Sequence, residues 1–313
     1  MRASLLAPLA LLLISGCIGP EDNPSQVRDL RVLGVALDPP ELMRRPQGGG
    51  AACVPDLEDP LSSDPLVYLQ EVEYRALIAD PAGAGRLLDY QLWACADLKD
   101  RDCQEAEERV LLAEGTTSEG ELVLRLRPAT AQLPDGTPLL QLVAGETGLT
   151  GAFTLWLPLV LKLTAGTEEL YAQKLMVLSC AWFPQMQANL QPTLPGILAG
   201  GAPLPTELRG PGPHPMRPVA FEDRQEPYVL VGLADPPKPV NLVETWKVAW
   251  YTDLGAFSPN QTGGTDPSGG SARHDVEWLP PAGNEERQVR FWFVVRDGRG
   301  GLSWLTHSAR YLP

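Results

Sequence analysis

The chain has 313 residues, of which 44% are hydrophobic, and a formal net charge of −14 at pH 7. This length suits two domains and the apolar content is sufficient for their cores, whereas the acidic balance argues against nucleic acid or anionic lipid headgroups as partners. The 30 glycines and 32 prolines amount to about a fifth of the residues against a usual share of about 12%, which favours short strands and turns over helices.

The N-terminus has the pattern of a secretory signal peptide. Arg2 is followed by the apolar run 5–14, and small residues then lead to Cys17. The apolar run is too short to cross a bilayer, which takes about 20 residues. A cysteine directly after Ser-Gly resembles the lipobox of bacterial lipoproteins, and this implies removal of the signal peptide, residues 1–16, and lipidation of the Cys17 thiol. The alternative is an ordinary signal peptide with a chance cysteine at this place.

Lipidation predicts the location of the protein. The membrane would hold the chain through acyl chains and not through a basic patch, because the surface is acidic. Ile18 follows Cys17, in place of the aspartate that retains some lipoproteins in the inner membrane, so the sequence favours the outer membrane. Residues 17–26 are polar and contain two prolines, and we expect them to form a tether between the lipid and the fold.

With Cys17 assigned to lipid, four cysteines remain. An even number in an exported chain favours two disulfides, and three pairings are possible. We favour Cys95–Cys103, which closes a short polar loop, and Cys53–Cys180, which ties the ends of the first domain. A zinc site is the rival interpretation, but it lacks Cys-x-x-Cys pairs and nearby histidines.

Residues 27–183 are predicted to form the first domain. In the segment 72–78, apolar and charged residues alternate, as in a strand with one buried and one solvated face. The run 153–163 is almost continuously apolar but contains Pro158, which predicts two strands or one strand at an edge. Further strands are expected at 29–35, 88–95, 122–127 and 170–180.

Residues 184–216 are rich in proline and glycine and poor in charge, which predicts a linker or irregular connection. Residues 217–313 then form a second domain, in which Asp297–Gly301 is a hairpin turn. Its strands are expected at 227–233, 244–251, 276–279, 288–296 and 302–312. Short strands at a spacing of about ten residues are typical of β-sandwiches, so we predict an all-β chain of two tandem sandwich domains.

Several motifs are similar to those of a group of lipoproteins found in myxobacteria and related bacteria. They include Leu30–Leu33 followed by Asp38-Pro39-Pro40-Glu41, Ala76–Gly83 leading to Trp93-Ala94-Cys95, and Val295–Gly301. The tryptophan and glycine pattern of the second half also resembles bacterial immunoglobulin-like and PKD-type domains. The resemblance implies two immunoglobulin-like β-sandwiches and a lipid-anchored location, and it carries no activity.

The sequence offers no recognisable catalytic machinery. A general base is most often histidine, and no Gly-x-Ser-x-Gly elbow accompanies the three histidines. Phosphate-binding glycine motifs and an EF-hand loop are also missing from the sequence. We therefore expect a non-enzymatic protein without cofactor or metal. The candidate residues are His214, His274 and His307 for catalysis, and Asp253, Asp266 and Asp275 for calcium.

The aromatic residues offer a better indication of function. Five of the eight tryptophans lie in the second domain, where they either fill the core or stack on sugars. Trp246 and Trp250 share a face with Val248, which favours the core. Trp292 shares its face with Arg290 and Arg296, so we expect Trp292 to be exposed or to line a groove, with the two arginines as neighbouring ligand-binding residues.

Together these patterns predict a lipid-anchored protein of the cell envelope with a binding or structural role. The main hypothesis is that its β-sandwich domains are presented to another protein. The alternative is a carbohydrate-binding module for an envelope or extracellular polysaccharide, acting through Trp292 and its neighbours.

Overall fold

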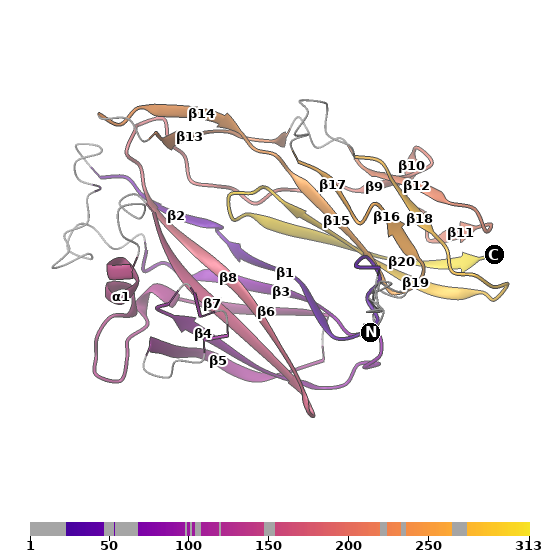
Figure 1. Cartoon of the computed structure of the whole chain (residues 1–313), viewed down its shortest axis with the longest axis horizontal. Helices are drawn as coiled ribbons and strands as arrows, with labels where there is room; N and C mark the ends of the chain where they lie inside the picture. Colours follow the sequence, from indigo (N-terminus) through magenta and orange to yellow (C-terminus); the bar gives the residue numbers. More distant parts are fainter. Residues whose placement is uncertain are drawn as a thin grey trace, which may run out of the picture.

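The computed structural model describes residues 23–46, 53, 68–97, 99–100, 102–103, 108–118, 120–146, 154–219, 224–232, 236–264 and 274–313. The expected signal peptide and Cys17 lie outside these residues. The described chain consists mainly of strands (Figure 1), which confirms the predicted all-β class. Its single α-helix, α1 (Leu139–Glu146), follows the 3-10 turn η4 (Pro128–Thr130).

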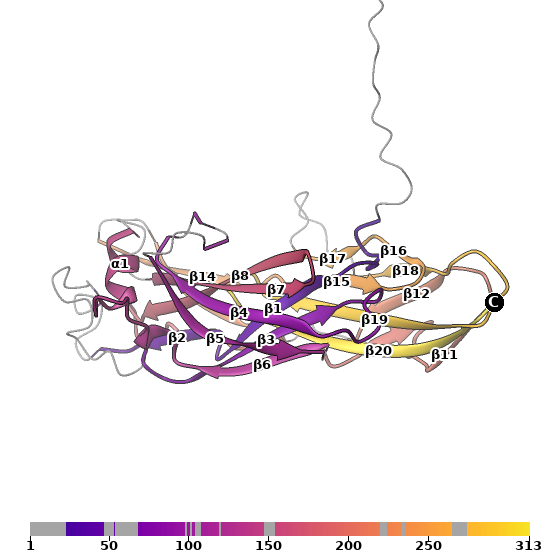
Figure 2. The ribbon, with the colours of Figure 1, turned by 90° about the horizontal axis from the view of Figure 1, so that it is seen from below.

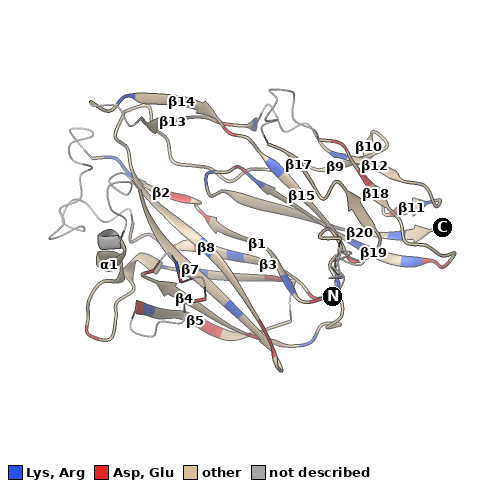
Figure 3. Cartoon of the chain, in the orientation of Figure 1, with Lys and Arg blue, Asp and Glu red and all other residues tan. Residues whose placement is uncertain are grey.

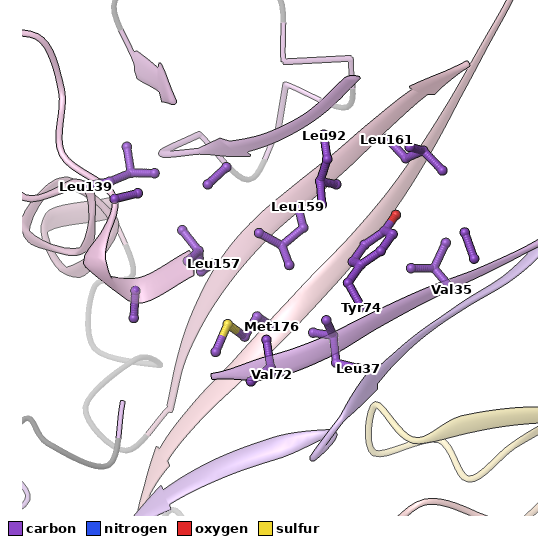
Figure 4. Packing of buried hydrophobic residues seen from close by; sticks show 14 of the residues in the cluster. Val35, Leu37, Val72, Tyr74, Leu92, Leu139, Leu157, Leu159, Leu161 and Met176 are labelled. Carbon is purple, nitrogen blue, oxygen red and sulfur yellow. The ribbon is translucent and has the colours of Figure 1, made fainter. Parts of the chain in front are cut away.

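The first sandwich has one sheet of three strands and one of five. The smaller has the order β1-β3-β6: β1 (Arg31–Asp38), β3 (Val72–Ala79) and β6 (Glu121–Leu126). The larger has the order β2-β8-β7-β4-β5: β2 (Glu41–Arg44), β8 (Glu168–Cys180), β7 (Thr154–Ala165), β4 (Leu88–Cys95) and β5 (Arg109–Thr117). The alternating apolar residues of both sheets meet in one core, in which Tyr74, Leu92 and Leu159 are fully buried (Figure 4).

The second sandwich has two sheets of five strands. One has the order β10-β9-β12-β18-β16: β10 (Ala202–Pro203), β9 (Ile197–Ala199), β12 (His214–Pro218), β18 (Val276–Leu279) and β16 (Ala256–Ser258). The other has the order β11-β20-β19-β15-β17: β11 (Glu207–Arg209), β20 (Leu302–Leu312), β19 (Arg287–Arg296), β15 (Lys247–Thr252) and β17 (Gln261–Gly263). A separate hairpin pairs β13 (Pro227–Val231) with β14 (Pro239–Val243).

Strand order identifies the second sandwich as immunoglobulin-like. When β9, β12, β15, β16, β18, β19 and β20 are lettered A to G, one sheet contains A-B-E-D and the other C-F-G, as in immunoglobulin constant-type domains. Trp250 on the C strand is fully buried, another feature of that fold. The first sandwich follows the same plan without a D strand. In each sandwich a short strand, β2 or β11, pairs in parallel with the G strand.

The structure places the start of the second sandwich earlier than the sequence predicted. Strands β9 to β12 lie in the segment 197–218, most of which was expected to be a connection, and they pair with β18 and β20. Ile197, Leu208 and Met216 from these strands are buried in its core. These strands have only two to five residues, and β10 and β12 contain prolines, so they lack the alternation from which a strand is predicted.

The expected tether is also shorter than 17–26. Ser25 is fully buried, and its Oγ accepts a 2.8 Å hydrogen bond from the N–H of Phe257 in β16. Val27 donates to the carbonyl of Thr252 in β15. The chain therefore contacts the second sandwich before it enters the first.

Both disulfides have the favoured pairing. Cys53 and Cys180 have a Cα–Cα distance of 5.6 Å, and Cys95 and Cys103 one of 6.0 Å. The first links a segment before β3 to the end of β8, and the second closes the loop between β4 and β5.

The two sandwiches pack face to face through one sheet of each. The outer faces of β1 and β3 contribute Leu33, Ala36, Leu77 and Ala79, and the outer faces of β15, β19 and β20 contribute Ala249, Trp292, Val294 and Leu302. These side chains form a buried apolar cluster that is separate from both cores. The two inner sheets are consequently covered on both faces, and Figure 2 shows β1 and β3 alongside β19 and β20.

A buried cluster of charged residues completes this contact. Arg299, at the tip of the hairpin that joins β19 to β20, lies 3.5 Å from Glu41 of the first sandwich and 3.2 Å from Glu244 of the second. Asn189 donates its backbone N–H to Glu41 and its side-chain amide to Asp297, both at 2.6 Å. These five residues, which we call the junction cluster, join both sandwiches and the segment between them.

Replacing Arg299 with methionine should destabilise the protein by about 3–5 kcal/mol, because removal of one partner leaves buried charges uncompensated. Additional Glu41→Gln and Glu244→Gln changes should restore part of the loss. The matched control is Arg209→Met, which breaks an exposed pair with Glu207 and should cost at most about 1 kcal/mol. Urea unfolding measures all of these variants, and equal losses in the two arginine variants would contradict the role of the cluster.

Lys174 donates a hydrogen bond from its ammonium group to the carbonyl of Gly300. This lysine should make the free energy of unfolding depend on pH in the alkaline range. Desolvation lowers the pKa of Lys174 to about 8, although the Asp297 carboxylate raises it. Between that value and the unfolded pKa of about 10.4, the unfolded chain binds more protons, so stability rises with pH by at most about 1.4 kcal/mol per unit. Urea unfolding across this window should show a smaller rise in Lys174→Met than in the native chain, and identical slopes would refute the assignment.

Candidate functional site

A cleft of about 440 Å³ lies between the two sandwiches. The first sandwich contributes the turn between β3 and β4 and the turn between β5 and β6. The second contributes neighbouring segments of β19 and β20. Interfaces between domains are common places for ligand sites, and this volume is in the usual range. We call this space the interdomain cleft.

The second sandwich forms one side of the cleft with the outer face of its inner sheet. Trp292 lies opposite Thr306, and Arg290 opposite Ser308, in the antiparallel register of β19 and β20. The Arg290 guanidinium lies 5.6 Å from the centre of the Trp292 ring. Asp253 accepts bonds of 2.8 Å from both the backbone N–H and the Nε of Arg290, so this arginine is held in place.

Of the two positions expected for Trp292, exposed or lining a groove, the structure shows the second. Only 6% of its surface is exposed, because the first sandwich covers its face of β19, although the residue still lines the cleft. Arg290 lines the same cleft. Arg296 does not: it donates to the carbonyl of Leu33 and lines a different hollow beside Lys174.

The first sandwich forms the other side of the cleft with residues held by ion pairs. Arg86 Nε lies 2.7 Å from Asp80, and its Nη2 lies 2.6 Å from Glu168. The hydrogen bonds that Arg86 donates to Asp80, and to a lesser degree to Glu168, raise the pKa of Arg86. Glu121 accepts a 2.6 Å bond from Arg75. In the turn that carries Asp80, a Cβ at Gly83 would lie 1.8 Å from an Asp80 oxygen, so a side chain there would displace the carboxylate that pairs with Arg86.

The cleft also brings together a histidine and carboxylates, the combination that an enzyme would need. However, His307 Nε2 lies 2.9 Å from the carbonyl of Pro205, which can only accept, so this nitrogen carries its proton toward the backbone. Asp80 and Glu121 are each paired with an arginine. The Nε2 atom of His307 and these two carboxylates are therefore already engaged by other groups of the protein.

The other predicted candidates are dispersed. Trp246, Trp250 and Trp278 are buried in the second core, and His214 packs against the ring of Trp278. Among the described residues, histidine, cysteine, aspartate and glutamate form no group of three suited to a metal. The described part of the chain also has no helix long and apolar enough to cross a membrane.

A second surface feature is the hairpin of β13 and β14, which we call the apolar hairpin. It stands apart from both sandwiches at the edge of the molecule (Figure 1), and within the described residues it forms a sheet of only two strands. Four of its large apolar side chains are 38–59% exposed: Leu230, Val240, Leu242 and Val243. Figure 3 shows the strands almost free of charged residues, with Lys238 next to β14.

The hydrogen-bond register of the hairpin determines which backbone groups point outward. Glu244 donates to Glu226, and Gly232 donates to Lys238. Because bonded and non-bonded pairs alternate in an antiparallel ladder, the odd-numbered residues between them direct their N–H and C=O away from the partner strand. The outward donors are therefore Val229 and Val231 on one edge and Asn241 and Val243 on the other.

The base of the hairpin contacts the junction cluster. The Arg299 guanidinium lies 4.4 Å from the centre of the Tyr228 ring, and Glu226 donates its backbone N–H to Glu244. Burial raises the pKa of Glu226, and the charge of Glu244 raises it further.

Comparison with known proteins gives no family for this chain. No protein-family model matches it, and no curated protein is similar in sequence. Similar solved structures include Escherichia coli alpha-2-macroglobulin (9% identity, TM-score 0.24). The match covers 92% of this chain but only 22% of the macroglobulin. The periplasmic chaperone SfaE (11%, TM-score 0.20) is covered over 99% of its length by 89% of the chain. Zebrafish RET cadherin-like domains (7%, TM-score 0.14) are covered over 41% by 72% of the chain. These scores are too low to support any functional argument.

Sequence reasoning missed most residues of both features. It singled out the motif Ala76–Gly83 but had no reason to place the turn that follows β3 beside β19, because that proximity results from the packing of the sandwiches. It predicted a strand at 227–233 but not its partner β14. The signal available for β14 was the uncharged run Pro239–Val243, which follows two prolines and a lysine at 236–238.

Proposed function

We propose that this protein is a lipid-anchored, non-enzymatic binding protein of the cell envelope that presents its β-sandwich domains to a protein partner. The observation that carries the proposal is the apolar hairpin. A two-stranded hairpin is at best marginally stable by itself in water, and contiguous exposed apolar residues commonly mark interaction surfaces. A partner that covers the hairpin would remove both disadvantages.

The edges of the hairpin support strand addition as the binding mode. Proteins protect most sheet edges by keeping strands short or charged. Here the edge strands β10, β11, β16 and β17 have two or three residues each, and β5 carries Arg109 and Glu114. Strand β14 has five residues and no charge. An extended segment of a partner protein fits such an edge, since its backbone pairs with the outward groups while its apolar side chains cover the hairpin.

The lipobox-like sequence supports the anchored location, with the outer membrane favoured over the inner by Ile18. The chain enters the fold at Ser25 on the second sandwich, and the hairpin lies well away from that point in both views (Figures 1 and 2). A protein attached through Cys17 would thus keep the hairpin at a distance from its point of attachment.

The carbohydrate-binding alternative requires a different geometry from the one first expected. A row of exposed rings on one face is not formed by the described tryptophans of the second sandwich, because Trp246, Trp250, Trp278 and Trp292 are all buried. The interdomain cleft, which Trp292 lines, is the place that we consider for such a ligand.

Changing Cys17 to serine should release the protein from the membrane. Without a thiol at this position no lipid can be attached, and the acidic surface provides no substitute anchor. Fractionation should find the native chain with the membranes and the variant in the soluble fraction. Mass spectrometry of the native N-terminal peptide should show a lipid on Cys17, and an unmodified cysteine there would disprove the anchor.

Changing Asn241 to proline should abolish capture of the protein partner. Proline removes one outward N–H of β14 but none of the bonds between the two hairpin strands, since proline is tolerated where the N–H faces away. In pull-downs from envelope extracts with the full chain in detergent, a specific partner is captured by the native chain and lost with Asn241→Pro.

The matched control is Asn241→Ala, which keeps the backbone N–H and should retain the partner. Val231→Pro tests the opposite edge in the same way. A partner retained by both proline variants, or lost equally with the alanine control, would rule out pairing at these edges.

A further inference from the structure

We propose that the interdomain cleft is a binding site for a neutral saccharide of one or two sugar rings. The proposal concerns a different part of the molecule from the apolar hairpin and does not depend on the protein-binding function. It rests on the charge balance of the cleft, the supply of hydrogen-bonding groups and the position of Trp292.

Every charged side chain named at the cleft takes part in an ion pair. Arg86 is paired with Asp80 and Glu168, and these ion pairs have N–O distances of 2.7 and 2.6 Å. Across the cleft, Arg290 is paired with Asp253 at 2.8 Å. Glu121 is likewise paired with Arg75. These carboxylates outnumber the arginines by one, so an anionic ligand would meet a small negative excess and a cationic ligand would compete with an arginine for a carboxylate, whereas a neutral ligand leaves all of the pairs intact.

The same groups retain hydrogen-bonding capacity. A guanidinium has five N–H donors, and the contacts of Arg86 with Asp80 and Glu168 engage only its Nε and Nη2. The contact of Glu121 with Arg75 engages Oε1. Hydroxyl groups that both donate and accept are supplied by Ser118, Thr306 and Ser308. A sugar carries several hydroxyls of the same dual character and can bond to such a mixed set.

The apolar part of the lining offers a sugar ring a small contact surface, since Trp292 is 6% and Leu77 2% exposed. Trp292 and Leu77 line the cleft and are fixed in the apolar cluster between the sandwiches. Arg290 extends beside the Trp292 ring. Because ion pairs and packing already hold these side chains, binding would order few of them, and this lowers the entropic cost of association.

The test blocks the cleft without removing any residue of the core. Ser308 is exposed and lies opposite Arg290, so Ser308→Trp places a large ring in the cleft. The matched control is Gln288→Trp. Gln288 lies in the neighbouring strand β19, so this variant adds the same ring to the same face of the sheet but outside the cleft. Thermal unfolding confirms that both variants are folded before binding is measured.

The full chain in detergent is first applied to an array of neutral glycans. The affinity of each glycan that binds is then measured by titration calorimetry. Inorganic sulfate and methylamine are titrated in the same way as charged probes. We expect a neutral glycan to bind the native chain and Gln288→Trp equally, with affinity lowered about tenfold or more in Ser308→Trp. Binding of sulfate or methylamine alone, binding that Ser308→Trp does not affect, or no binding at all would overturn the proposal. Asn241→Pro should leave sugar binding unchanged, which separates this result from that of the hairpin.

Discussion

The fold depends on the ion pairs that Arg299 makes with two buried glutamates from different sandwiches. Glu41 belongs to the first sandwich and Glu244 to the second, and both are buried, with 9% and 3% of their surfaces exposed. Placing the counter-charge on a hairpin tip means that β19 and β20 must be in register, and the first sandwich in contact, before the three charges are compensated. Buried pairs of this kind are weak sources of net stability but penalise every arrangement in which one partner is missing. The junction cluster therefore specifies a single relative position for the sandwiches.

This single position explains why β19 is apolar on both faces. Phe291 and Phe293 face the core of the second sandwich, while Trp292 and Val294 face the first. The apolar contact is limited to the middle of the strand. At Arg290, nearer its start, the two sandwiches separate, and the polar groups of both surround the interdomain cleft. The cleft is thus a consequence of face-to-face packing, and its shape is as fixed as the junction itself.

The parts of the fold that depend on local pattern could be predicted from the sequence. Alternation in the segment 72–78, the hairpin turn at Asp297–Gly301 and the even number of cysteines led to strands, sandwiches and disulfides that the structure contains. Pro158 predicted two strands or one strand at an edge, whereas β7 is a single strand between β8 and β4. The proline is tolerated there because β4 pairs with β7 only from Leu159 onward. The parts that depend on tertiary contacts could not be predicted. The first strands of the second sandwich are too short to show a period, and nothing in the sequence around Trp292 shows that another domain covers it.

The apolar hairpin is connected to the junction through the same guanidinium. Arg299 stacks on Tyr228 at the base of β13 while it compensates Glu41 and Glu244. A side chain that fills three roles at once has little freedom to move, so the base of the hairpin is rigid where it leaves the second sandwich. Its strands, in contrast, expose apolar side chains and open edges. A rigid base with unsatisfied edges is pre-organised for association, because little order has to be imposed when a partner strand is added. The junction cluster thereby supports the base of the apolar hairpin.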